Sequence, residues 1–276
     1  MTTILIFVIS IAAGMLGAMT GQGGGVLLVP FLTLIMRVDV KTAIAASIVS
    51  VIATSSGSAS AYVRDRLSNV KIGMYLEMFT IIGALVGAAI TLRSGGHFIY
   101  MIFGLVLLAS FVALWFKPDM GETANLKQDR LSAFLELHGE YYDQATGKTV
   151  AYKGTRAAFG GTLMFGAGLI AGMLGIGAGA LKVLIHDLVM ELPPKVSTTT
   201  SNFIIGVTAL AGTSAYLAAG LIKPSIAVPV IVGVTIGSRF GTRVLVRLTN
   251  AAVRKFFMVV LFILGSEMVL RGLGVL

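Results

Sequence analysis

The sequence predicts an all-α polytopic membrane protein made of two inverted repeats, each a glycine-broken re-entrant helix pair followed by three transmembrane helices. Three observations predict this class. Hydrophobic residues make up 56% of the 276-residue chain, and charged residues only 12%. Clusters of glycine interrupt two of the long apolar runs. The first half of the chain also matches the second half when it is shifted by a constant number of positions.

The composition places most of the chain in a lipid bilayer. The charged fraction is half of the roughly 25% found in soluble domains, and several apolar runs approach the roughly 20 residues that cross a bilayer as a helix. The net charge of +9 comes from Lys and Arg residues that lie mainly between these runs, where they set orientation, so nucleic acid is not an expected partner. The chain has no cysteine, which excludes disulfides and thiolate chemistry. We expect no cofactor and no metal site.

The apolar runs divide the chain into two transmembrane repeats and a linker. The first repeat covers residues 1–116, the cytoplasmic linker 117–155 and the second repeat 156–276. The runs of the first repeat are 4–20, 26–36, 42–62, 72–92 and 98–116. Those of the second repeat are 157–174, 180–190, 196–219, 225–243 and 256–275.

A constant offset of 154 positions (175 − 21) relates the two halves without a gap. It places Gly21 on Gly175, Gly23 on Gly177, Gly25 on Gly179, Lys41 on Lys195 and Ser47 on Ser201. Apolar helices share composition by chance, but a constant offset that holds over several helices and their loops indicates an internal repeat.

Loop charges predict how the repeats are oriented, because Lys and Arg gather in cytoplasmic loops. In the first half they gather at 63–71, and in the second half at 239–255, which lies after the following helix. Equivalent loops therefore face opposite sides, as in an inverted repeat. With both regions cytoplasmic, each broken segment returns to the side it entered from, and both termini lie outside.

Four glycines in five positions break the first apolar run: Gly21, Gly23, Gly24 and Gly25. They remove so much helix propensity that we expect the backbone to unwind there, which lipid tolerates only where protein or a water-filled cavity covers it. The run after the break, 26–36, rises only about 16 Å as a helix, roughly half of the hydrocarbon core. Its first N–H groups would point into the membrane interior, as in the anion sites of transporters.

The polar linker is predicted to hold a short amphipathic helix at 131–137 and a small β-hairpin around the turn at Thr146 and Gly147. Its acidic and basic residues are nearly balanced, so neither nucleic acid nor lipid headgroups are favoured ligands. A plain linker is favoured over a regulatory element.

Four motifs resemble those of the TauE/SafE sulfite exporter family, also called the 4-toluene sulfonate uptake permease family. They are GQGGGVLLVP at 21–30, YYDQATGKTVAY at 141–152, GMLGIGAG at 172–179 and TSNFIIGVT at 200–208. The resemblance implies a bacterial or archaeal carrier in the cell (inner) membrane that moves sulfite, sulfonates or other small organic anions, several members being inferred exporters. One departure is Ala178, where the family typically has glycine. We expect its methyl group only to narrow the space through which an anion approaches the backbone.

The predicted site combines both glycine breaks with polar side chains of the helices that follow them. The candidate substrate-binding residues are Gly21, Gln22, Gly23, Gly24, Gly25, Ser47, Gly175, Gly177, Gly179, Lys182, Thr200, Ser201 and Asn202. Hydroxyl and amide groups can donate to an oxyanion without a fixed charge. Helix capping and close helix packing are the alternative roles of Thr200, Ser201 and Asn202.

Two charged side chains have a second interpretation. Lys182 stands in the first turn of the second short helix, where it either binds the anion or snorkels to an interface. Glu267 lies near the middle of the last helix by rise alone, so it is paired or protonated there and is a candidate for proton or ion coupling. His186 is expected nearer the interface. Arg243 and Arg247 are expected to be cytoplasmic anchors, while Arg239, on the same helical face, is a candidate for reaching the transport pathway.

The predicted function is a secondary carrier of a small anion. An intramembrane hydrolase or phosphatase needs clustered carboxylates, Arg or His at the re-entrant loops, which carry Gly, Gln22 and Ile176 instead. An enzyme is therefore disfavoured. An anion channel remains an alternative because the same short helices can line an open pore. The sequence leaves the oligomeric state open, a homo-oligomer included.

Overall fold

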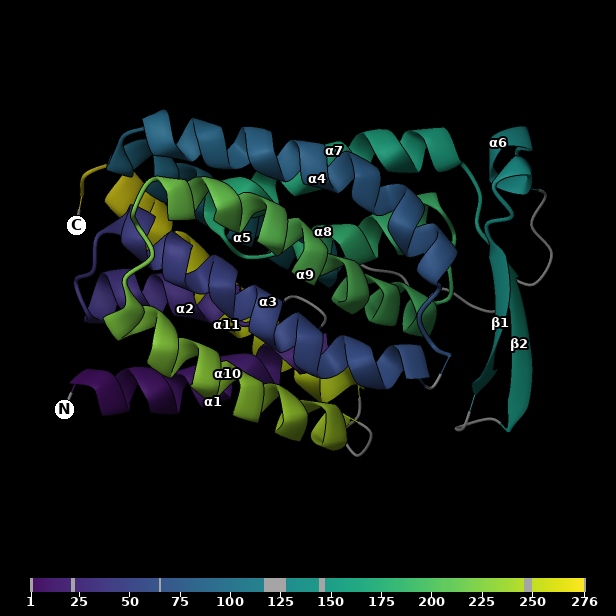
Figure 1. Ribbon diagram of the computed structural model, residues 1–276, viewed down its shortest axis with the longest axis horizontal. Helices are drawn as coiled ribbons and strands as arrows, with labels where there is room; N and C mark the ends of the chain where they lie inside the picture. The colour runs from purple at the N-terminus through teal and green to yellow at the C-terminus, as the bar shows by residue number, and fades with distance from the viewer. Residues whose placement is uncertain are drawn as a thin grey trace.

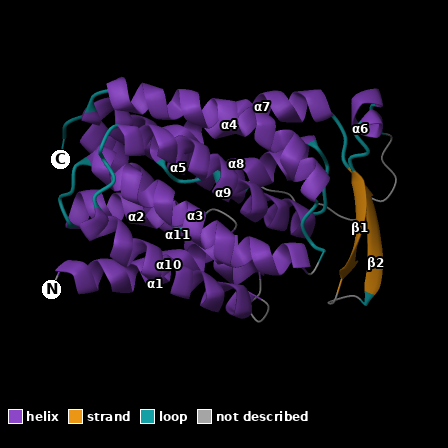
Figure 2. Cartoon of the chain, viewed as in Figure 1, coloured by secondary structure: helices purple, strands orange, loops and turns teal. Residues whose placement is uncertain are grey.

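The computed structural model describes residues 2–20, 23–64, 66–116, 128–143, 147–245 and 250–275, and these form a helical bundle with a small hairpin at one end (Figures 1 and 2). The first half holds the α-helices α1 (Thr2–Thr20), α2 (Gly25–Pro30), α3 (Val40–Arg64), α4 (Val70–Arg93) and α5 (Gly96–Trp115), with the π-helical segment η1 (Phe31–Ile35) after α2. The second half holds α7 (Ala157–Leu174), α8 (Gly179–Leu184), η2 (Ile185–Val189), α9 (Pro194–Ala218), α10 (Pro224–Leu245) and α11 (Asn250–Gly272). Between them lie α6 (Arg130–Phe134), β1 (His138–Asp143) and β2 (Lys148–Lys153).

The helices have the length and composition of membrane spans. Within the described parts of the chain, six helices are long and apolar enough to cross a bilayer: α3, α4, α5, α7, α9 and α10. This confirms an all-α, multi-pass membrane protein. The helical segments on the two sides of the second break differ in length. The helix α7, before the break, has 18 residues and rises about 27 Å, whereas α8 and η2, after the break, together have only 11 residues.

The broken segment of the second half turns back on itself. The backbone N–H of Thr155, just before α7, donates to the carbonyl of Met190, just after η2, at 3.1 Å. The start of α7 and the end of η2 therefore lie at the same end of the bundle.

Helices of the first half pack against helices of the second half at contacts lined by glycine. A Cβ added to Gly83 of α4 would lie 2.2 Å from the carbonyl oxygen of Phe165 in α7. The 154-residue offset maps these two residues onto Gly237 of α10 and Ile11 of α1, and a Cβ on Gly237 would lie 2.0 Å from the carbonyl oxygen of Ile11. Glycine lets the backbones of both helix pairs approach this closely, and the two contacts are equivalent residue by residue.

Equivalent helices pack antiparallel. In α3 and α9, Ser55 hydrogen-bonds to the carbonyl of Asn202 at 2.6 Å, while Ile48, earlier in α3, lies against Gly212, later in α9. Antiparallel equivalents are what a two-fold rotation perpendicular to the helices produces. The inverted orientation of the repeats in a bilayer stays a prediction, which this packing supports.

The predicted β-hairpin is present in the linker, where β1 pairs antiparallel with β2. The predicted amphipathic helix is shorter than expected, since α6 covers only Arg130–Phe134. The side chain of Asn69, which caps α4, donates to the carbonyl of His138 at 3.1 Å and to the hydroxyl of Tyr152 at 2.9 Å. The hairpin therefore docks on the end of the bundle opposite to the chain termini (Figure 1).

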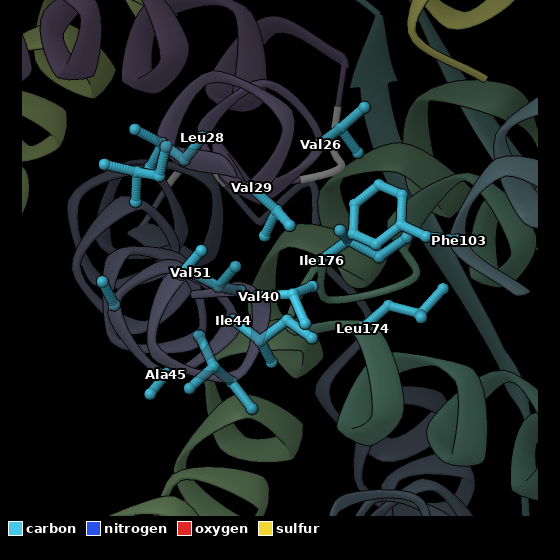
Figure 3. Close-up of a cluster of buried hydrophobic side chains, with 14 of the residues drawn as sticks. Val26, Leu28, Val29, Val40, Ile44, Ala45, Val51, Phe103, Leu174 and Ile176 are labelled. Carbon is cyan, nitrogen blue, oxygen red and sulfur yellow. The ribbon is translucent and has the colours of Figure 1, made fainter. Parts of the chain in front are cut away.

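The apolar core surrounds the point where the broken segments enter the bundle. Figure 3 shows Val26 of α2, Ile44 of α3, Phe103 of α5, and Leu174 and Ile176 at the second break gathered in one cluster. These residues come from both halves of the chain, so the core holds the two breaks together.

Candidate functional site

The two glycine breaks meet in the middle of the bundle. A Cβ added to Gly25 would lie 2.6 Å from the carbonyl oxygen of Gly175, 2.6 Å from Ser47 Oγ and 2.9 Å from the Cα of Ile176. No side chain fits there, so Gly25 is required for the first break to touch the second. The candidates Gly21 and Gln22 lie outside the described residues.

Left-handed backbone explains some of the glycines but not all. Gly23, Gly175 and Gly177 have φ values of +66°, +64° and +71°, where glycine is strongly preferred. Gly24 instead has φ of −59°, in the right-handed region that any residue adopts. Glycine leaves room there for the backbone of α1, because an added Cβ would lie 3.0 Å from the carbonyl oxygen of Ala13.

Ala178 carries more strain than its small side chain suggests. It precedes α8 with φ of +46° and ψ of +31°, in the left-handed region. A non-glycine residue costs about 1–2 kcal/mol there. The departure from glycine therefore strains the backbone of the break, whereas we had expected it only to narrow the space through which an anion approaches the backbone.

Both breaks lead into short helices, as predicted. The helices α2 and α8 start at Gly25 and Gly179, have six residues each and continue into η1 and η2. A small cavity lies beside both starts, between α5 and α11. It is lined by Val26, Val106, Leu107, Ser110, Ile176, Ala178, Gly179, Leu181 and Leu261. The side chains are almost all apolar, so a polar ligand at this position would depend on backbone groups.

The two equivalent serines face the breaks. Ser47 Oγ of α3 donates to the carbonyl of Gly175 at 2.7 Å, and Ser201 Oγ of α9 lies 3.4 Å from the carbonyl of Gly179. The only hydroxyl hydrogen of Ser47 is used by the second break, so this side chain holds the break in place. Whether either serine contacts a substrate stays a prediction.

The other two members of the predicted TSN group have different neighbours. Thr200 Oγ1 accepts a hydrogen bond from the backbone N–H of Asn69 at 3.0 Å, near the hairpin end of the bundle. The Asn202 side chain lies between α3 and α9, where its Nδ2 donates to the carbonyl of Thr198 at 3.3 Å and its Oδ1 lies 3.5 Å from Ser58 Oγ. The structure therefore brings Ser201, but not the whole group, to the second break.

Lys182 is fully buried, so the snorkelling interpretation is wrong. Its side chain is 0% exposed and donates a hydrogen bond to Thr208 Oγ1 of α9. Its Nζ lies 3.7 Å from Oε2 of Glu77 in α4, which is 1% exposed. The ion pair therefore joins α4 to α8 inside the bundle, and the hydroxyl of Thr208 adds α9 to the same cluster.

Sequence reasoning missed Glu77, whose two carboxylate oxygens both accept hydrogen bonds inside the bundle. Thr208 Oγ1 lies 2.7 Å from Oε1 and 2.9 Å from Oε2 of Glu77, and Thr80 Oγ1 donates to Oε2 at 2.6 Å. The available signal was a lone carboxylate inside an apolar run, which marks intramembrane functional sites. The same signal had singled out Glu267.

Glu267 is only half-buried on α11, and within the described chain it has no hydrogen-bond or ion-pair partner. Its coupling role stays a prediction. His186 and Asp187 beside it are both buried, and the expected position of His186 nearer the membrane interface stays a prediction. Arg239 is exposed on α10, and the side chain of Arg243 and all of Arg247 lie outside the described residues.

Comparisons with known proteins agree over nearly the whole chain. A family model described as "Sulfite exporter TauE/SafE" matches residues 6–268. A probable membrane transporter protein of Bacillus subtilis (strain 168), YunE, is 25% identical over 280 residues, which cover 99% of each chain. A second from the same organism, YdhB, is 24% identical over 240 residues, covering 87% of this chain and 89% of that one. No solved structure matches this chain significantly.

Proposed function

Because this chain belongs to the TauE/SafE sulfite exporter family and is a multi-pass membrane transporter, we propose that it is a secondary carrier of small anions such as sulfite or organosulfonates, acting as an exporter. We place the substrate between the starts of α2 and α8. The observation that carries this proposal is the contact of the two breaks, with Gly25 against Gly175 and the starts of both short helices beside one cavity.

The proposed binding mode follows from helix electrostatics. The first N–H groups of a helix have no partner within it, and the helix dipole places a partial positive charge at the same end. Two such starts beside one cavity favour an anion without a fixed charge in its wall. Sulfite and sulfonates present several oxygens on one sulfur atom, so one ligand can accept hydrogen bonds from both helices. The sulfur-containing class itself rests on the family.

A carrier must open its binding site to each face of the membrane in turn. The breaks are fixed mainly by packing between the two halves, through Gly25 and through the hydrogen bond from Ser47 to Gly175. A rigid-body movement of one half against the other would therefore open the site first to one side and then to the other.

Reconstituted protein tests the proposal against an anion channel. Labelled sulfite or 4-toluenesulfonate inside liposomes should exchange with unlabelled anion outside, and the flux should saturate with concentration. A carrier accelerates such exchange when the same anion is present on both sides. Flux that rises linearly with concentration and shows no acceleration would identify a channel.

Binding can be measured separately in detergent. A bound anion raises the melting temperature by mass action, so sulfite, sulfate, sulfoacetate, taurine and small carboxylates should be compared at equal concentration. We expect the sulfur oxyanions to raise it most. If none of them raises it and none exchanges, the proposed substrate class is wrong.

A further inference from the structure

A buried ion pair joins Glu77 of the first half to Lys182 of the second, and the equivalent positions of the repeat lack it. The 154-residue offset maps Glu77 onto Ile231 (77 + 154) and Lys182 onto Leu28 (182 − 154). Leu28 is fully buried in the apolar core, where Figure 3 labels it. The equivalent positions of the repeat therefore hold apolar side chains, so the repeated helix arrangement does not depend on a charge at either position.

Stability is a poor explanation for the pair. Taking two charges out of water costs free energy that their attraction does not reliably return, and apolar replacements of buried pairs are often neutral or stabilising. Ionisable side chains inside a membrane bundle typically mark ion and proton pathways. The cavity at the start of α8 also reaches Leu181, the residue before Lys182.

Resting on the carrier function proposed above, we propose that Glu77 and Lys182 form the coupling site at which one proton and one small oxyanion enter together. The proton forms an O–H bond with a carboxylate oxygen of Glu77. Lys182, released from its partner, then donates hydrogen bonds to the oxyanion. No covalent bond of the anion changes, and the steps reverse when the load is released.

Charge balance requires one proton to be bound with each monovalent anion. In the unloaded state the positive charge of Lys182 balances the negative charge of Glu77. An anion alone would leave a net negative charge in the bundle, and a proton alone a net positive one, both of which are unfavourable at low dielectric. A proton and a monovalent anion together keep the site neutral.

Thr208 is placed to follow this exchange. In the unloaded state its hydroxyl accepts a hydrogen bond from Lys182 and donates to Glu77. Because a hydroxyl both donates and accepts, it can turn when Glu77 is protonated and accept from the new carboxylic acid. The hydroxyl of Thr54, the equivalent residue in the first half (208 − 154), donates to the carbonyl of Ser50 in its own helix at 2.9 Å, and it has no other partner among the described residues.

His186 provides a further proton acceptor one turn beyond Lys182. Its Nδ1 lies 3.2 Å from the carbonyl oxygen of Ser197, and a carbonyl can only accept, so Nδ1 carries the hydrogen of the neutral ring. The lone pair is then on Nε2, which is buried and has no hydrogen-bond partner among the described residues. We assign His186 as the position from which the proton reaches Glu77 on the hairpin side.

Within the described chain, few other ionisable side chains surround the Glu77–Lys182 pair, so few groups can exchange protons with it. The segment η2 contributes His186 and Asp187, both buried. From α4 and α9 the pair is faced by the hydroxyls of Thr80 and Thr208. The helix α7 has no titratable side chain, and α5 meets the start of α8 with apolar residues and Ser110.

Proton and anion movement can be measured together in liposomes. With 4-toluenesulfonate, which stays ionised across the pH range used, a sulfonate gradient should drive protons in the same direction, seen with a pH-sensitive dye in the lumen. Glu77→Gln should keep sulfonate exchange but lose proton movement and pH dependence. Lys182→Met should lose sulfonate flux. The surface variant Glu140→Gln, on β1, serves as the control and should match the wild type.

Two results would overturn the inference while leaving the carrier intact. One is sulfonate flux in the wild type that moves no protons. The other is loss of coupling in Glu267→Gln while Glu77→Gln keeps it, which would assign coupling to the last helix.

A stability measurement decides the role of the pair even if no sulfonate is carried. The double variant Glu77→Ile with Lys182→Leu gives each position the residue found at its equivalent in the other half, Ile231 and Leu28. We expect it to fold and to melt at or above the temperature of the wild type. A clearly lower melting temperature in detergent would show that the pair is structural, and the inference would then be wrong. Failure of every anion to exchange, with a stable double variant, would instead refute the proposed function.

Discussion

Ser47 of α3 donates its hydroxyl hydrogen to the carbonyl oxygen of Gly175 at 2.7 Å, so the first half of the chain holds the glycine break of the second. The contact is buried and joins residues that are far apart in the sequence. It lies beside Gly25, whose missing side chain leaves room for both groups. The two breaks therefore form one structural unit, and changes at either should affect both.

Ser47→Ala should destabilise this unit. The variant leaves a buried carbonyl without its partner, which costs about 1–3 kcal/mol. The free energy of unfolding in detergent should fall by that amount, and anion flux should fall with it. Ser56→Ala is a matched control on the same helix, because Ser56 is exposed and bonds only to the carbonyl of Ile52. Its effect should stay within about 0.5 kcal/mol, and equal losses in both variants would contradict the role given to Ser47.

Gly25→Ala should abolish transport while leaving insertion into the membrane intact. The added methyl group would lie 2.6 Å from both the Gly175 carbonyl oxygen and Ser47 Oγ, so the two breaks must separate. Gly166→Ala on α7 is the control, since an added Cβ meets no atom within 4 Å there. This control should be neutral or stabilising by up to about 1 kcal/mol through helix propensity. Normal exchange by well-expressed Gly25→Ala would show that the breaks need not touch.

Ala178→Gly should stabilise the protein. Ala178 has φ of +46°, and glycine removes about 1–2 kcal/mol of left-handed strain, partly offset by the greater freedom of glycine in the unfolded chain. Ala171→Gly, inside α7, is the opposite case and should destabilise by at least about 0.5–1 kcal/mol. Thermal unfolding of the two variants tests this, and a lower melting temperature for Ala178→Gly would mean that its methyl contacts outweigh the strain.

Single cysteines can test the inverted topology, because the native chain has none. Val70, at the start of α4, is 43% exposed, and Asn250 starts α11. Cysteines at these two positions should react with an impermeant thiol reagent from the same side of the membrane. Gly95, between α4 and α5, has open space for a side chain and should react from the other side. Reaction of Val70→Cys and Asn250→Cys from opposite sides would refute the inverted arrangement.

The hairpin should loosen in acid through Asp129. Burial raises the pKa of its carboxyl, but hydrogen bonds from Ser132 and from the backbone N–H of Arg156 outweigh this and hold the pKa below its ordinary value. A carboxyl with a lowered folded pKa stabilises the fold above its ordinary pKa, and this contribution is lost as the pH falls through the folded pKa. Protease cleavage of the linker should therefore rise in this acid range. Asp129→Asn should remove most of that pH dependence, and unchanged acid sensitivity in this variant would assign it to other groups.

Local patterns in the sequence were enough for the class of protein, the glycine breaks and the hairpin. Apolar run length, glycine density and turn residues act over a few neighbouring positions, so they can be recognised without knowing what packs where. The left-handed backbone at Gly23, Gly175 and Gly177 follows from the same local preferences. At Gly24, φ is −59° and the residue lies close to the backbone of α1, a contact that local patterns do not reveal.

Only the tertiary structure decided which charged residues are buried and paired. Glu77 and Glu267 are both lone carboxylates in apolar runs, and no local pattern separates them. Glu77 is buried because α8 and α9 bring Lys182 and Thr208 to it, whereas Glu267 on α11 stays half-exposed. The position of Thr200, beside Asn69 and away from the break, was equally beyond local patterns. Burial and pairing are properties of contacts between distant segments, and these exist only once the two halves have packed together.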